Sequence, residues 1–316
     1  MPQLPPNIYE QQSANKRNTV IVMGMFTLFV GLLGFGVDAF VLGAEAQFPV
    51  ATFVALSIGA GSAYWGLANG ATTVLAASSA TPVPPDDPKY QQLRNVADEM
   101  AIASGMPRPQ LFIIPDPDPN AFATGRDPAR ACIAVTEGLV ERLSREELQA
   151  VIAHEMSHVR NYDTRMMTVV AALAGAVMLL SEFGLRAMRF GGGGRKRDRG
   201  GLGPILLVFW LVAMVLAPLI TQLLSMAVSR QREYLADASG AELTRNPLAL
   251  ASALEKIDSA VEPTRSIKKG TGHLCIADPL ERSVNSKEGS LADLFATHPP
   301  IGKRIMLLKA MAYQHA

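Results

Sequence analysis

Four long apolar blocks restrict the folds open to this chain. They are Thr19–Val37, Pro49–Ala77, Met166–Phe183 and Ile205–Met226. The first block alone would extend roughly 28 Å as a helix, which is enough to cross the hydrocarbon core of a bilayer. Charged residues make up 18% of the 316 residues, whereas a soluble domain usually carries about a quarter. We therefore expect a mainly α integral membrane protein with up to four transmembrane helices.

The blocks divide the chain into five parts. We expect a flexible tail at 1–18, two transmembrane helices at 19–80, a soluble segment at 81–165, two membrane-associated or transmembrane helices at 166–226, and a second soluble segment at 227–316.

The charges beside the blocks bear on orientation. Lys16 and Arg17 precede the first block, so the positive-inside rule favours a cytoplasmic N-terminus and cytoplasmic soluble segments. The basic loop at 186–199 would then lie outside, against the same rule. Reversing the whole chain would place this loop inside but leave Lys16 and Arg17 outside. Alternatively, the last two blocks do not cross fully and the loop contacts anionic lipid heads on the inner face. No small-residue cleavage site follows the first block, so we expect it to be retained.

A short histidine motif carries the clearest chemistry. In His154-Glu155-Met156-Ser157-His158 the two histidines are four apart, so on a helix both imidazoles project from one face and can reach one metal ion. Glu155 could act on a water at the open side of that ion. Ser144 and Glu147 fit a capping box, which predicts a helix from Arg145 to about Asn161 that runs on into the third block. The alternative is a helix that happens to carry two exposed histidines.

The soluble segment before the motif shows both helix and strand patterns. We expect a helix at Tyr90–Ser104, ended by Gly105 and Pro107, and strands at Leu111–Ile114 and Ala131–Thr136. The Pro- and Asp-rich turn at 115–119 could join the two strands as a pair. The sequence therefore predicts a small β-sheet beside the motif helix.

A catalytic zinc usually has three protein ligands, so a third must come from elsewhere. Glu233 and Asp237, after the fourth block, are four apart and share a helix face. Glu233 could bind the metal while Asp237 accepts a hydrogen bond from a ligating imidazole. Spacing alone equally allows a surface helix with ion pairs to Arg230 and Arg232.

Several segments together resemble a known family. They are Asn120-Ala121-Phe122-Ala123, Ile133–Leu139, His154–His158, Arg232-Glu233-Tyr234-Leu235-Ala236-Asp237 and Thr297-His298-Pro299-Pro300. Their order and spacing over residues 90–305 are similar to those of the HtpX-type membrane zinc metalloproteases, which are related to the CAAX prenyl endopeptidases.

The resemblance implies a zincin-type metalloprotease domain with one zinc ion per chain. It implies His154, His158 and Glu233 as metal ligands, Glu155 as general base, Asp237 as the carboxylate behind a ligand, His298 as oxyanion donor, and Asn120, Ala121, Phe122 and Ala123 as an edge strand for substrate. Two alternatives remain open: His298 as an ordinary histidine at a helix start, and the strand as part of a plain hairpin turn.

The implied function is cleavage of damaged or misfolded membrane proteins, in a bacterial inner membrane and with the site facing the cytoplasm. Rival hypotheses are a narrow-specificity processing protease, an intramembrane protease, and a non-proteolytic scaffold with structural zinc. Expected partners are protein substrates and the lipid bilayer. A net charge of +1 argues against a nucleic-acid partner, and no nucleotide is expected. Two cysteines do not form a disulfide framework.

Overall fold

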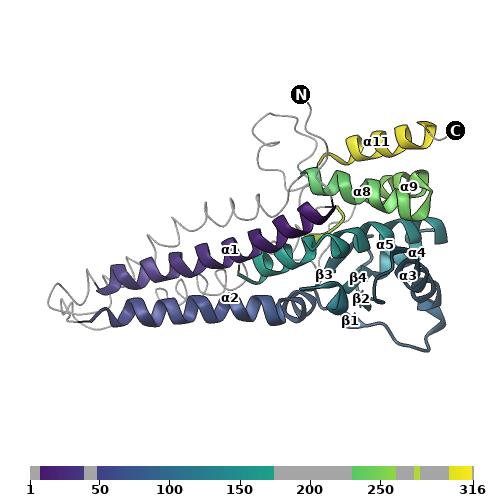
Figure 1. The fold of residues 1–316 in the computed structure, drawn as a ribbon. Helices are drawn as coiled ribbons and strands as arrows, with labels where there is room; N and C mark the ends of the chain where they lie inside the picture. The colour runs from purple at the N-terminus through teal and green to yellow at the C-terminus, as the bar shows by residue number, and fades with distance from the viewer. Residues whose placement is uncertain (1–7, 39–47, 174–229, 261–273, 278–298, 315–316) are drawn as a thin grey trace, which may run out of the picture.

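The computed structural model describes residues 8–38, 48–173, 230–260, 274–277 and 299–314. Two long helices, α1 (Ile8–Val37) and α2 (Val50–Ala77), lie side by side and extend away from the remaining elements (Figure 1). Small residues allow the helices to approach: a Cβ added at Gly34 would lie 2.4 Å from the carbonyl oxygen of Ala51. The expected flexible tail at 1–18 is wrong for residues 8–18, which form the first turns of α1.

Among the described residues, α2 is the helix that is long and apolar enough to cross a membrane. Its large apolar side chains face outward, as at Ile58 and Trp65, which are 58% and 63% exposed. In α1, Leu28 and Leu32 are similarly exposed. The second half of the third apolar block and the whole of the fourth lie outside the described residues.

A four-stranded sheet lies at the base of the two long helices, in the order β1-β2-β4-β3. The strands are β1 (Thr81–Pro82), β2 (Gln110–Ile114), β3 (Ala121–Thr124) and β4 (Cys132–Thr136). The two predicted strands pair as expected, but as parallel neighbours. A hairpin around 115–119 is wrong because β3 follows that turn and pairs antiparallel with β4 at the sheet edge.

Helices cover this sheet and enclose the core. They are α3 (Gln91–Ser104), α4 (Glu137–Arg142), α5 (Arg145–Arg160), α8 (Arg230–Thr244), α9 (Pro247–Asp258) and α11 (Ile301–Gln314), with short 3₁₀ turns at Pro88–Tyr90 and Pro128–Arg130. The central helix is α5, which packs against α3, α8, α9 and β3. Because it is covered on all sides, nearly every residue from Glu147 to Val159 is buried.

The boundaries of α5 have local causes. Ser144 and Glu147 form the predicted capping box. At the other end the helix stops at Arg160, and Tyr162 adopts a left-handed φ of 60°. Residues 163–173 are helical again. The expected continuous run from the motif helix into the third block is therefore interrupted by a turn.

Glu147 also joins α5 to α9. Its carboxylate accepts hydrogen bonds from Ser252 Oγ and Lys256 Nζ, both at 2.7 Å. Burial alone would raise the pKa of Glu147, but the bonds from Lys256, Ser252 and the Ser144 N–H hold it below its ordinary value of 4.5. The ionised form is therefore the one that the fold stabilises.

We predict that Glu147→Gln lowers the free energy of unfolding by about 1–2 kcal/mol near neutral pH. Because the folded pKa is depressed, this contribution is fully present above pH 4.5 and is lost as the pH falls through the folded value. Thermal unfolding of the detergent-solubilised chain across this range measures it. Glu242→Gln, at an exposed site on α8, is the control. An equal difference between Glu147→Gln and wild type at all pH values would contradict the assignment.

Candidate metal centre

The two motif histidines meet at one point inside the protein. His154 and His158 are one turn apart on α5, and their Nε2 atoms are 3.2 Å apart. Both residues are buried, with 0% and 6% of their surface exposed. This removes the alternative of two exposed histidines on a surface helix.

Helix α8 brings Glu233 to the same point. Its carboxylate oxygens lie 3.7 Å from His154 Nε2 and 3.5 Å from His158 Nε2. The approach depends on Gly240, where an added Cβ would lie 3.0 Å from the backbone nitrogen of His154. Glu233, Asp237 and Gly240 follow one another at helical spacing, so the face that contacts α5 is also the face that carries the carboxylates. The alternative of a solvated α8 surface is wrong, because Glu233 and Asp237 are 3% and 2% exposed.

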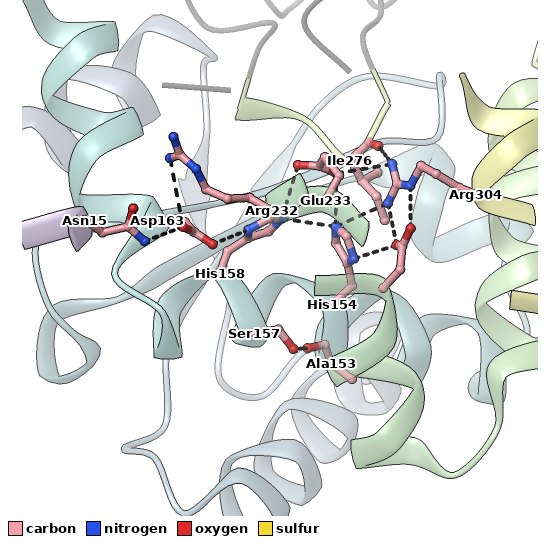
Figure 2. Close-up of polar contacts among 11 residues, drawn as sticks. Asn15, Ala153, His154, Ser157, His158, Asp163, Arg232, Glu233, Ile276 and Arg304 are labelled. Carbon is pink, nitrogen blue, oxygen red and sulfur yellow. Dashed lines mark hydrogen bonds and ion pairs between the residues drawn. The ribbon is translucent and has the colours of Figure 1, made fainter. Parts of the chain in front are cut away.

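A carboxylate stands behind each imidazole. His154 Nδ1 lies 3.0 Å from Asp237 Oδ1, and His158 Nδ1 lies 3.1 Å from Asp163 Oδ2 (Figure 2). A ring N–H held in this way leaves the Nε2 lone pair directed at the opposite side, toward Glu233. The Nε2 atoms of both histidines can therefore coordinate a metal ion placed between them.

These three residues fit a zinc ion. Tetrahedral zinc with bonds of about 2.0–2.2 Å to nitrogen and oxygen separates its ligand atoms by roughly 3.3–3.6 Å. The three distances between Nε2, Nε2 and Glu233 oxygens, from 3.2 to 3.7 Å, lie close to that range. Within the described parts of the chain, no other group of His, Cys, Asp and Glu side chains meets the same test for a metal.

The electrostatics also favour a cation. Burial alone would lower the pKa of His158, but the carboxylates of Glu233 and Asp163 outweigh it and raise this pKa to about 9. Protonated His158 is thus favoured by the same negative charges that would favour a metal.

Glu155 has a separate environment. It is 1% exposed, and burial raises the pKa of its carboxyl to about 7. The backbone N–H of Ala123, on β3, donates a hydrogen bond to it. A carboxyl group whose pKa lies near neutrality can both accept and return a proton.

Arg304 on α11 was not predicted from the sequence. It is fully buried and makes a two-pronged pair with Asp237, with Nε–Oδ2 and Nη2–Oδ1 distances of 2.8 and 2.7 Å. Its Nη1 donates to the carbonyl of Ile276 at 2.7 Å and lies 3.3 Å from Glu233 Oε2 (Figure 2). Its spacing in the sequence could have indicated burial, because Arg304 shares one face of α11 with Ile301 and Leu308. All three residues are buried.

The predicted substrate strand is at the sheet edge, but much of it is already engaged. Asn120 is fully buried, and its side-chain amide donates to Ala277 O at 3.0 Å. The carbonyl of Ala121 accepts from Ile276 N at 2.9 Å. Phe122 is buried and forms a bridge with Cys275. Because outward-facing backbone groups alternate along an edge strand, Ala123 is the next position along β3 that faces away from β4.

The remaining predicted site residue, His298, lies outside the described residues. Pro299, next to it, is buried at the start of the segment that leads into α11. Arg304 follows one turn into that helix, so the C-terminal segment does reach the metal centre.

These features define a metallopeptidase site. Two histidines point inward from one helix, a crossing helix supplies a third ligand, and a buried glutamate lies beside them. The profile of peptidase family M48 matches residues 88–312, and the chain belongs to this family. It is a membrane-associated metallo-endopeptidase.

Two curated relatives extend the similarity over nearly the whole chain. The Protease HtpX homolog of Caldanaerobacter subterraneus subsp. tengcongensis is 43% identical over 307 residues, covering 96% of this chain and 98% of the relative. The Protease HtpX homolog of Ligilactobacillus salivarius is 42% identical, covering 96% and 100%. Among solved structures, Ste24p of S. mikatae is similar at 18% identity and a TM-score of 0.47, over 95% of this chain and 66% of that one. That likeness is too weak to compare the sites.

We predict that Glu233→Ala loses its metal while Glu242→Ala, on the exposed side of the same helix, retains it. Removing the carboxylate leaves only the two imidazoles, which are insufficient to hold zinc against dialysis. Metal content per chain, measured by atomic emission after dialysis against a weak chelator, tests this. Full metal content in Glu233→Ala would exclude Glu233 as a ligand.

Proposed function

We propose that this chain is a zinc-dependent endopeptidase that cleaves damaged or misfolded membrane proteins. The observation that supports the catalytic part is the convergence of His154, His158 and Glu233 within ligand distance of one another, with buried Glu155 next in sequence. The set offers nitrogen and oxygen donors from three protein ligands. It therefore suits a catalytic zinc with one position left for water, rather than a closed structural site with four ligands.

The chemistry divides between the metal and the protein. A bound zinc ion supplies a Lewis acid that polarises the peptide carbonyl and acidifies water. Glu155 accepts a proton from the attacking water and delivers it to the leaving amine. Its hydrogen bond from Ala123 N–H holds the carboxylate beside β3, and its raised pKa suits both halves of this transfer. His298 is proposed to donate to the oxyanion.

Substrate would bind as an extended strand along β3. Ala121 already bonds to Ile276 through its carbonyl, and the N–H of Ala123 is bonded to Glu155. Peptide pairing is therefore assigned to the carbonyl of Ala123 and to the positions that follow it. Binding through backbone groups selects for extended chain rather than for particular side chains. Broad cleavage of unfolded segments follows from that mode.

We infer spans within 19–80 and membrane association of 166–226, with both soluble segments, 81–165 and 227–316, on the cytoplasmic side of a bacterial inner membrane. The exposed apolar faces of α1 and α2 support burial in lipid. The first turns of α1 are bonded to the end of α5, so the metal centre lies close to the point where α1 would enter the bilayer. A protease held there reaches polypeptide that emerges from the membrane.

We predict that Glu155→Gln lowers cleavage of unfolded casein by about 10²–10⁴-fold, because the general base is lost. Its metal content should equal that of the wild type, since Glu155 is not a ligand. Full-length protein in detergent is assayed with zinc and with a chelator. A Glu155→Gln variant that cleaves at the wild-type rate would remove Glu155 from the mechanism.

The same assay with a heat-denatured membrane protein in mixed micelles tests the substrate class. The proposal expects cleavage at several sites in the denatured form and little in the native form. Cleavage at one defined site in both forms would instead identify a narrow-specificity processing protease.

A further inference from the structure

The turn that follows α5 is strained. Tyr162 has a φ of 60°, in the left-handed region that side chains other than Asn, Asp and Gly seldom adopt. Such a conformation persists only when surrounding contacts hold it. It directs the chain so that Asp163, five positions after His158, returns to bond that histidine.

The first turns of α1 contact this turn at several points. Asn15 Nδ2 donates to the carbonyl of Asn161 at 2.9 Å and to Asp163 Oδ1 at 2.6 Å. Gln12 Nε2 donates to the carbonyl of Arg160 at 2.8 Å. Lys16 Nζ lies 4.0 Å from the centre of the Tyr162 ring. Three residues from the far N-terminal end thus contact four consecutive residues at the end of the metal helix.

Asn15 is the contact that leads into the metal centre. It is 3% exposed and Asp163 is 0% exposed, so their hydrogen bond is shielded from water. The other oxygen of Asp163 bonds His158 Nδ1 at 3.1 Å. Arg232 is farther from the carboxylate, with Nη1 4.0 Å from Oδ1. The path from α1 to a metal ligand therefore has two hydrogen bonds, Asn15 to Asp163 and Asp163 to His158 (Figure 2).

We propose that Asn15 is a positioning residue of the metal centre. By holding Asp163, it fixes the carboxylate that keeps the proton of His158 on Nδ1 and directs Nε2 at the metal. Helix α1, for which we propose a membrane span, is in this way joined to a metal ligand. This inference rests on the proposed zinc site.

A purely structural role would have different consequences. If Asn15 served only to dock α1, then Gln12, which docks the same helix to Arg160 without contact to Asp163, should matter equally. Asn18 provides a second comparison, because it is the same residue type on α1 and is only half-buried.

The experiment measures zinc affinity of the full-length chain in detergent, by competition with a chromophoric chelator. Asn15→Ala is expected to weaken zinc binding about 10- to 100-fold, which is the usual effect of removing hydrogen-bond partners that orient a metal ligand. Gln12→Ala and Asn18→Ala are expected to stay within about threefold of wild type. In an Asp163→Ala background, Asn15→Ala should add little, because the two residues act through one path. If Asn15→Ala does not yield folded protein, Asn15→Ser, whose hydroxyl is too short to reach Asp163, replaces it with the same expectations.

Three results would overturn the proposal. They are wild-type affinity in the Asn15 variant, an equal loss in Gln12→Ala, and an undiminished effect of Asn15→Ala when Asp163 is already absent. A wild-type chain that binds no zinc would instead contradict the proposed function itself, so the two failures are distinguishable.

Discussion

The structure depends on the balance of buried charge around two histidines. Four carboxylates and two guanidinium groups converge there, all nearly removed from solvent: Asp163, Glu155, Glu233, Asp237, Arg232 and Arg304. If all six are ionised and both histidines are neutral, as metal ligands must be, two negative charges remain uncompensated, and isolated charge in a dry interior is costly. A divalent cation supplies the missing charge. The packing of α8 and α11 against α5 and the binding of metal are therefore linked, and metal is expected to stabilise the folded chain.

This balance also separates the tasks of similar side chains. Asp163 bonds Nδ1 of His158, and Asp237 lies 3.0 Å from Nδ1 of His154, so both carboxylates orient the ligands. Glu233 faces both Nε2 atoms, whereas Glu155 turns to Ala123 on β3. Position relative to the two imidazole rings, rather than residue type, decides which carboxylate orients, which binds metal and which moves a proton.

Local signals predicted the motif helix and its start at Arg145 because both depend on neighbouring residues. Glu233 was predicted as a ligand only with the help of a resemblance, because its spacing to Asp237 suits a surface helix equally well. The hairpin connection between β2 and β4 was wrong, because β3 follows the turn at 115–119 and pairs with β4. The edge strand at 120–123 was expected only from the resemblance, since no local signal gave its partner. Arg304 and Asn15 were missed because their partners lie 67 and 148 positions away. Such contacts exist only after α1, α5, α8 and α11 have packed together.

The most direct test of the central claim is X-ray absorption at the zinc edge on the full-length, metal-loaded chain. The account predicts a four-coordinate shell of nitrogen and oxygen at about 2.0–2.2 Å, including the outer-shell scattering of two imidazoles. A sulfur neighbour at about 2.3 Å, which would bring Cys132 or Cys275 into the site, or a shell without imidazole scattering would contradict it.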